Sequence, residues 1–583
     1  MIPEELVKKW RYRLHRADSA HKQWRESFRV EDLDRYWEGA QEPSWWAERF
    51  FIPINLIFSN IQNQMDFMLS GVPKFIVKPS RTYWPTPDML QILSKQAELR
   101  EAILNYNVRE EGLKAELRKS LLDAFIAFGV IKNHYTPYHS ENPRRGRTIR
   151  GTTQTEPDLL LSKEEFSFSR RDPMNIRFDP NADSLETIKW VAERIEMTLD
   201  EAKDNPLFKN TEDLKAFDIR IEEKESENRR KKGENVVVMT GGNSSLAGLA
   251  LNDYKEEIVY VWEIYDLEEN KIVCIAEGYD KALRDDPMPE GIEGHSYAFL
   301  YFIPRRNSPY PIPDIWHQVG PQDEYNVTRN QIMIHRRRFN RKYTYRIGSV
   351  DKEELDKVED PVDGSLIGVK QDGDVIRPIK DAPLDQAVYF DVGMLRKDFM
   401  DVAGEAVPDS ELAKIEKATV ANLVADRQGN RRRGKLGMLQ EFLAIIGRKQ
   451  IQLYEAEMTL SVAVPITGQT GQEWLRIDPG DITSVEGEFH YEVDVTSLMP
   501  LIPEVERASW VGFLQLVAMN PQILQSPVLA KKTAQMFGVT DKEILTEITA
   551  AAERLIQQQM LQGGQAGQPS MSPDMGKALG FQQ

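Results

Sequence analysis

The sequence has 583 residues, of which 41% are hydrophobic and 29% are charged, and its formal net charge is −17. This length predicts roughly two to four domains with sizeable hydrophobic cores. The acidic balance argues against a domain that grips nucleic acid tightly, because such domains cluster Lys and Arg against the phosphates. It is compatible with a surface past which DNA slides, since like charges repel.

The first third of the chain alternates helical and extended patterns. Apolar residues at helical spacing predict helices, and short apolar runs bounded by turn residues predict strands. Short amphipathic helices rich in Trp and Arg are expected within 1–49, and longer helices at 54–70 and 88–128. Strands are expected at 74–78 and 130–135.

The following segment is expected to consist mainly of strands joined by polar loops. Residues 139–157 are basic and indicate an exposed loop, and the charged residues 198–234 are helical in pattern. Residues 233–253 are rich in Gly, Ser and Asn, which indicates a flexible insertion. Further strands are expected within 166–195 and at 258–265, 271–277 and 296–303. Together with the first third, these strands predict one α+β domain.

Residues 313–403 predict a stalk. A helix at 313–342 and another at 384–403 flank short strands and turns at 343–383. Apolar residues in the second helix recur with a period close to 3.5, which is typical of a helix packed lengthwise on its neighbours. These residues are Leu384, Val388, Val392, Leu395, Phe399 and Val402. Such a stalk has little core of its own, so it is expected to pack on other copies of the chain.

The last part of the chain is predicted to be mainly helical. Helical runs are expected at 409–427 and 435–464, followed by a β-hairpin made of 473–477 and 488–495. Residues 503–561 are helical in pattern. Residues 562–583 are rich in Gly, Gln, Pro and Ser and indicate a flexible tail.

The composition of the chain also limits the cellular compartment in which it is expected. Cys274 is the single cysteine, so neither a disulfide within the chain nor a cysteine-based zinc site is expected, which favours intracellular folding. The basic N-terminal residues precede no apolar run, so no secretory signal is expected. Apolar stretches such as 50–58 and 513–519 are too short to span a bilayer. We expect a soluble protein with no membrane partner.

Two motifs match the patterns of known ligand sites only in part. Gly429–Leu436 matches a phosphate-binding loop until its last residue, where Leu replaces the Ser or Thr that ligates magnesium. Asp179, Asn181 and Asp183 have the spacing that opens a calcium loop, but Gly at position six and Glu at position twelve are absent. We therefore expect a turn at Asp179, and we predict no cofactor, no metal and no catalytic residue.

Two clusters of basic residues stand out. The denser cluster ends the first stalk helix and comprises His335, Arg336, Arg337, Arg338, Arg341 and Lys342. These cations would either stabilise the helix C-terminus and pair with acids of a neighbouring copy, or form a ring of positive charge toward a polyanion or a viral partner.

The second cluster is expected on a loop near 427–436. It comprises Arg427, Arg431, Arg432, Arg433 and Lys435. In one copy it is a solvated basic loop. In a ring of copies it would present a belt of positive charge that contacts phosphates without recognising bases.

The order of these elements resembles the portal proteins, or head–tail connectors, of tailed double-stranded DNA bacteriophages, with the closest likeness to those of short-tailed phages. Residues 86–138 look like the long wing helix, a second helix, a glycine and a strand. Residues 172–203 are similar to the strand segment that places an Asp-Pro turn before a Trp-Val strand. Residues 301–340 look like the entry to the first stem helix, and residues 488–524 resemble the transition from hairpin to crown.

The resemblance implies an α+β portal fold with an α/β wing, a two-helix stem, a small β-rich clip and a helical crown. The implied regions are a wing at 1–312 and 404–500 with a channel loop near 427–436, stem helices at 313–342 and 384–403, a clip at 343–383, a crown at 501–561 and a tail at 562–583.

The same resemblance implies a non-enzymatic function. The chain would form a dodecameric ring at one capsid vertex of the virion, after assembly in the host cytoplasm, as the channel for genome packaging and ejection. Its implied partners are double-stranded DNA bound without sequence preference, the terminase large subunit, head–tail adaptor proteins, and the major capsid and scaffolding proteins.

Three alternatives remain open. Another head–tail connector ring would usually be a much shorter chain. A DNA-acting nuclease or NTPase would need a compact acidic metal cluster or an intact phosphate loop. A cytosolic scaffold explains the composition but not the predicted stalk.

Overall fold

The protein is described by a computed structural model that defines most of the chain up to residue 498. The described residues are 3–46, 51–80, 86–141, 159–216, 257–339, 343–359, 368–370, 376–378, 386–404, 418–468, 471–483 and 489–498, with isolated positions beyond. The chain forms two compact units, Met1–Asp494 and Val495–Gln583. The predicted crown at 501–561 and tail at 562–583 lie almost wholly outside the described residues.

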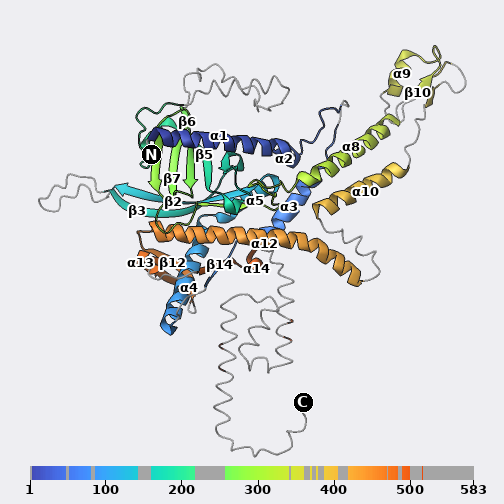
Figure 1. Cartoon of the computed structure of the whole chain (residues 1–583). Helices are drawn as coiled ribbons and strands as arrows, with labels where there is room; N and C mark the ends of the chain where they lie inside the picture. Colours follow the sequence, from blue (N-terminus) through green and yellow to red (C-terminus); the bar gives the residue numbers. More distant parts are fainter. Residues whose placement is uncertain are drawn as a thin grey trace, which may run out of the picture. The chain divides into compact units, whose positions relative to one another are not determined.

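A five-stranded antiparallel sheet forms the centre of the first unit. Its strands are neighbours in chain order: β4 Ile176–Phe178, β5 Trp190–Thr198, β6 Ile258–Asp266, β7 Lys271–Ala276 and β8 Ala282–Pro287. The long helix α1 (Pro3–Phe28) covers one face of this sheet (Figure 1). Trp10 packs there edge-on against Trp190, with ring centroids 5.6 Å apart. Neighbouring strand residues point to opposite faces, so the sheet is buried on both sides.

A three-stranded sheet faces the other side of the first sheet. Its strand order is β3 (Leu159–Arg170), β2 (Gly129–Glu141) and β9 (Tyr297–Leu300), and all pairs are antiparallel. The core between the two sheets is rich in aromatic rings, including Phe128 and Phe178. Helix α5 (Leu113–Ile126) packs on β2 and β3. The short helices α6 (Leu199–Asp204) and η1 (Pro173–Asn175) contact β5 of the first sheet, and η2 (Leu185–Thr187) lies between β4 and β5 in the chain.

The helix α12 (Ala418–Glu457) runs along the outer face of the three-stranded sheet (Figure 1). Asn133 of β2 donates to the carbonyl of Ile446, and Gln450 donates to the carbonyl of Phe166. Elements beyond it are α4 Pro87–Glu110, β1 Phe75–Pro79, β12 Val462–Gly468, β13 Gly471–Ile477, α13 Pro479–Thr483 and β14 Phe489–Val493.

Two helices project from the body and end in a small tip (Figure 1). Helix α8 (Trp316–Phe339) leads outward and α10 (Gln386–Ala403) returns along it. The tip contains β10 Tyr343–Tyr345, α9 Lys352–Glu359 and β11 Ile376–Pro378, with β10 and β11 paired antiparallel. The remaining described helices are α2 Val30–Glu38, α3 Leu56–Met68 and, in the second unit, α14 Val495–Leu498.

The fold class is α+β, as predicted, with antiparallel pairing in every described sheet. The helices at 54–70, 313–342 and 384–403 and the strands at 74–78, 258–265 and 271–277 correspond to α3, α8, α10, β1, β6 and β7. The N-terminal helices are longer than predicted, because α1 alone has 26 residues. The run at 88–128 is two helices, and Gly112 between them has φ 63°, a conformation that glycine adopts readily.

The predicted β-hairpin of 473–477 and 488–495 is wrong. Strand β13 pairs with β12, which begins at Val462 within a stretch predicted to be helical. Strand β14 pairs instead with β1, with Phe75 opposite Val493. Alternating residues identify a strand but not its partner, and this partner lies more than 400 residues away in the chain.

The predicted channel loop near 427–436 is also wrong, because this segment is continuous helix within α12. Glycines at 429, 434 and 437 lowered its helical propensity and suggested a loop. Leu436, Leu439 and Phe442 are buried on one side of the helix, and this packing outweighs the propensity.

Candidate functional site

The basic cluster of α12 lies where the stalk joins the body, and its members have different surroundings. Arg431 caps the last turn of α10: its Nη1 donates to the carbonyls of Asp401, at 3.1 Å, and of Val402, at 3.2 Å. A cation at a helix C-terminus neutralises carbonyls that lack partners within the helix. Gly404 follows with φ 72°, and a Cβ there would lie 2.8 Å from Arg431 Cδ. Arg431 therefore joins α12 to the end of the stalk.

Lys435 is held inside the junction. Its Nζ lies 2.7 Å from Asp314 Oδ2 and 2.8 Å from Gln64 Oε1. The rings of Phe125 and Phe302 lie 4.9 and 5.0 Å from the same atom. Burial lowers the pKa of Lys435, although the carboxylate of Asp314 acts in the opposite direction. Lys435 fixes α12 to α3 and to the segment that enters α8.

Arg432 and Arg433, like Arg431, have surface open to solvent. Arg432 is partly exposed and Arg433 is exposed, and Arg432 lines a cavity of about 640 Å³ between α3, α8, α10 and α12. We call it the junction cavity. Arg427 lies on α12, but its side chain is outside the described residues. Of the predicted DNA contacts, Arg432 combines accessible surface with the absence of a hydrogen-bond or ion-pair partner among the described residues.

The predicted basic cluster of the stem lies at the distal end of α8. His335 is partly exposed, and Arg336 and Arg337 are exposed, on its last turns. Arg338 belongs to the helix but its side chain is outside the described part, as are Arg341 and Lys342 altogether. The cations therefore gather near the C-terminal end of the helix dipole.

The predicted packing seam of α10 is present over most of its length. Leu395 and Phe399 are buried, and Val388 and Val392 are partly buried. Val402 is 40% exposed at the helix end beside the junction cavity, so its packing against a neighbour stays a prediction. Leu384 lies outside the described residues.

A row of buried amide side chains runs along one face of α8, and sequence reasoning missed it. Gln318, Gln322, Asn326 and Asn330 recur every four residues, so they share one helix face. None of them is more than 3% exposed. This amide ladder was detectable as a four-residue repeat of Gln and Asn, which rarely occupy buried helix positions without a partner.

The amide ladder binds the main chain of the extended segment that precedes α3. Asn330 and Ile52 exchange two hydrogen bonds, because Ile52 N donates at 2.8 Å and Asn330 Nδ2 donates at 2.9 Å. Ile54 N donates to Asn326 at 2.9 Å, and Gln322 donates to the carbonyl of Ile54 at 2.8 Å. Extended residues two apart point their polar main-chain groups the same way, so α8 replaces a neighbouring strand.

The ladder continues into the body as a chain of polar contacts. Gln318 accepts from Asn60 at 2.9 Å, and Asn60 accepts from Gln64 at 2.7 Å. Gln64 in turn accepts from Lys435 of α12. The stalk helix, α3 and α12 are thereby linked by buried hydrogen bonds.

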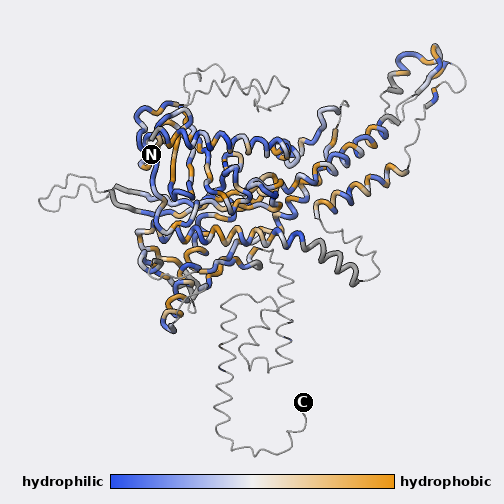
Figure 2. Tube along the Cα trace, in the orientation of Figure 1, coloured by the Kyte–Doolittle hydropathy of each residue, from blue (hydrophilic) through white to orange (hydrophobic). Residues whose placement is uncertain are grey.

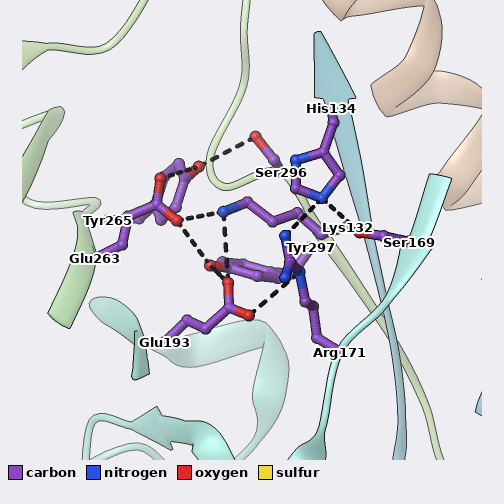
Figure 3. Close-up of polar contacts among 9 residues, drawn as sticks. All are labelled: Lys132, His134, Ser169, Arg171, Glu193, Glu263, Tyr265, Ser296 and Tyr297. Atoms are coloured by element: carbon purple, nitrogen blue, oxygen red, sulfur yellow. Dashed lines mark hydrogen bonds and ion pairs between the residues drawn. The ribbon is translucent and has the colours of Figure 1, made fainter. Parts of the chain in front are cut away.

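A second buried polar cluster ties the two sheets together (Figure 3). Lys132 of β2 extends between Glu193 of β5, at 3.4 Å, and Glu263 of β6. Tyr297 of β9 donates to Glu193 at 2.7 Å, and Arg171 pairs with the same carboxylate at 3.2 Å. Two cations and two carboxylates balance, which is the condition for burying charge without a large penalty.

The protonation states of this cluster argue for a structural role. Burial alone would lower the pKa of Lys132, but Glu263, Tyr265 and Glu193 outweigh it and raise the pKa. Burial alone would raise the pKa of Glu263, but Lys132 outweighs it and lowers the pKa. Both groups therefore stay charged at neutral pH, and neither is poised for the proton transfer that catalysis needs.

The histidine beside this cluster is also unsuited to proton transfer. Burial, together with Lys132 and Arg171, lowers the pKa of His134 to about 3. His134 contacts Ser169 and lies 2.9 Å from Arg171 Nη2 (Figure 3). It is therefore neutral at physiological pH.

The rejected motifs are accounted for by local structure. Asp179 Oδ1 accepts from the backbone N–H of Asn181, which forms a turn as predicted. The phosphate-loop pattern at Gly429–Leu436 lies within α12 and so lacks the loop shape that surrounds a phosphate. The thiol of Cys274 is buried in β7, which raises its pKa.

Within the described residues, no group of three or more His, Cys, Asp or Glu side chains is arranged to hold a metal ion. Among the described helices, none combines the length and apolar character needed to cross a membrane.

No model of a known protein family matches this chain, and no curated protein matches it significantly.

Proposed function

We propose that the chain is a ring-forming portal protein of a tailed double-stranded DNA bacteriophage, the channel for genome packaging and ejection at one capsid vertex. The proposal is carried by one observation: the stalk helix α10 has apolar residues on two separate faces, and α8 covers only one of them. A helix with this pattern needs a second neighbour, and in a ring that neighbour is the adjacent copy.

The uncovered face is defined by Phe390 and Met394, which are 74% and 64% exposed. At 100° per residue, Phe390 lies about 140–180° and Met394 about 100–140° around the helix from Leu395 and Phe399, which form the seam. Figure 2 shows apolar positions recurring along α10. Large exposed apolar side chains grouped on one surface mark an interaction site.

The remaining features agree with a rigid, sequence-blind channel. The amide ladder and Arg431 fix both stalk helices to the body, so forces on the tip would reach the body without bending the junction. About twelve copies at −17 each carry roughly −200, which would keep DNA from adhering except near cations such as Arg432 and Arg433.

The proposed partners follow from this assignment. The tip at 343–383 would dock the terminase large subunit and later the adaptor proteins. The body would contact the major capsid and scaffolding proteins. Another head–tail connector ring is the second candidate, because an uncovered stalk face supports any ring of this kind.

The test is the mass and shape of the purified full chain, alone and with the capsid scaffolding protein. Light scattering should give about twelve subunits, and negative-stain images should show a central hole. A chain that stays monomeric in both conditions contradicts the proposal. In that case magnesium-dependent cleavage of duplex DNA would test the alternative of a DNA-acting enzyme.

A further inference from the structure

The junction cavity combines size, charge and an apolar wall in a way that the ring proposal does not explain. Its volume of about 640 Å³ is in the range of small-molecule sites. It is lined by α3, the segment entering α8, the first turn of α8, the last turn of α10, and α12.

The polar side of the cavity is cationic. Arg431, Arg432 and Lys435 line it against a single carboxylate, Asp314, so its formal charge is +2 with His317 neutral. The whole chain, in contrast, carries −17. Such a concentration of positive charge in an acidic protein favours an anion.

The cations differ in what they are free to do. Arg431 is bonded to the carbonyls that end α10, and Lys435 is paired with Asp314 at 2.7 Å. Arg432 has no hydrogen-bond or ion-pair partner among the described residues, although it lines the cavity. The same is true of His317, in the first turn of the 24-residue helix α8, whose N-terminal dipole adds positive potential.

The other wall is apolar. Phe302, Ile303 and Met438 line it, together with Val402 and Ala403 at the end of α10. An inorganic anion would leave this wall in contact with water. A ligand with one anionic group and a planar or apolar body would satisfy both sides.

We propose that the junction cavity binds a phosphate ester, with the phosphate on the guanidinium of Arg432 and the organic part against Phe302 and Met438. Arginine favours phosphate because its parallel N–H groups match two phosphate oxygens. This proposal goes beyond the ring assignment, because the cavity lies within one copy of the chain.

Two sources supply this chemistry: a free nucleotide and a phosphodiester of DNA. A bound ester would bridge α8, α10 and α12, so it would stabilise the attachment of the stalk. The two sources are separated by competition.

The experiment titrates the purified full chain with deoxyadenosine monophosphate and follows binding by calorimetry and thermal unfolding. Saturable binding at one site per chain is expected. Deoxyadenosine, which lacks the phosphate, should bind at least about tenfold more weakly, because the contact with Arg432 is lost. Equal binding of the two compounds would show that the phosphate is not recognised and would overturn the proposal.

The informative variant is Arg432→Gln, which removes the charge but keeps a polar side chain. We expect its affinity for the nucleotide to fall about tenfold or more. The matched control is Arg448→Gln, the same change at an exposed position 16 residues further along α12, roughly 24 Å away. Light scattering on both variants shows whether ring assembly is unchanged, which separates this test from that of the ring.

A short DNA duplex is then added to the nucleotide complex. Displacement of the nucleotide by duplex at low salt, together with weaker direct binding of the duplex to Arg432→Gln than to Arg448→Gln, identifies a DNA phosphodiester as the source. Nucleotide binding that duplex does not displace identifies a free nucleotide. If neither compound binds in a way that depends on Arg432, the cavity is not a phosphate-ester site.

Discussion

Arg431 and Gly404 are in close contact where the stalk joins the body. The guanidinium reaches the last carbonyls of α10 only because Gly404 places no Cβ in its path. Gly404 also has a positive φ, a conformation that glycine commonly adopts at helix ends. Sequence reasoning singled out Arg431 as basic, but the helix end that it caps is close only in the folded chain.

Substitution of Gly404 by Ala should therefore destabilise the protein by about 1–3 kcal/mol, from the unfavourable φ and the contact with Arg431. Chemical unfolding measures the loss. Arg431→Ala in the same background should recover part of it, because the variant lacks the Cδ atom that lies nearest to the added Cβ. Equal effects of Gly404→Ala with and without Arg431→Ala would show that the two residues are independent.

His21 is a single residue that is expected to make the stability of the protein depend on pH. It lies between Trp24 and Tyr310, with both ring centroids 5.4 Å away. Burial, followed by the charges of Arg177 and Arg25, lowers the pKa of His21 to about 2. In the unfolded chain the imidazole of His21 is protonated below about pH 6.5, whereas in the folded chain it stays neutral. The free energy of unfolding therefore falls as the pH drops below that value.

The variant His21→Phe keeps an aromatic ring but cannot be protonated. Relative to pH 7, the wild-type protein should lose about 2 kcal/mol at pH 5 through this residue, and the variant should not. Thermal unfolding at the two pH values measures the difference. His15→Phe is the control, because His15 is exposed on the same helix. Identical pH profiles for wild type and His21→Phe would contradict the assignment.

At the scale of elements, the sequence specifies what is periodic and misses what depends on distant partners. The helices α3, α8 and α10 and the strands β6 and β7 follow their local patterns closely. The pairing of β1 with β14 and the helical state of 427–436 do not, because both are decided by packing between segments far apart in the chain.

In the candidate site, too, local sequence located the residues but did not show their roles. Composition and local runs located the cations Arg431, Arg432 and Lys435. Local sequence could not separate them into a helix cap, a cavity wall and a buried ion pair, because Asp314 and the end of α10 come from other elements. The amide ladder is visible in the sequence as a four-residue repeat. Its partner is not, because the ladder binds main-chain atoms, and these leave no pattern in the sequence of the partner segment.

The amide ladder predicts a large loss of stability when one of its amides is replaced by an apolar side chain of similar shape. Gln322→Leu should destabilise the protein by about 3 kcal/mol, because the buried N–H of Ile57 loses its partner. The carbonyl of Ile54 and the N–H of Leu56 also lose their bonds to Gln322 and keep only the bond between them. Chemical denaturation measures this. Gln331→Leu is the matched control, since Gln331 is exposed on the same helix. Similar losses in both variants would mean that the ladder contributes little.

For the whole molecule, the decisive question is whether the outer face of α10 is covered by another copy. Phe390→Glu places a charge on that face, where burial against a neighbour would cost several kcal/mol. Assembly of the variant should require a protein concentration higher by about tenfold or more, as measured by light scattering. Its thermal unfolding as a monomer should be unchanged, because Phe390 is 74% exposed.

Tyr12→Glu provides the comparison, because Tyr12 is 67% exposed on α1, away from the stalk. It should leave assembly unaffected. A Phe390→Glu variant that assembles as readily as wild type would remove the observation on which the ring proposal depends.

The amide ladder has a consequence for how this chain can diverge. Its hydrogen bonds to residues 52–57 end on main-chain atoms, so they do not depend on which side chains those residues carry. We expect a library randomised at 52 and 54 to retain folded members of varied composition but to be depleted of proline, which lacks the N–H that each position donates. Proline at 53 escapes this selection, because in the described contacts the ladder takes its N–H groups from residues 52 and 54 on either side. Over generations, the amide row should change slowly while the segment it holds drifts.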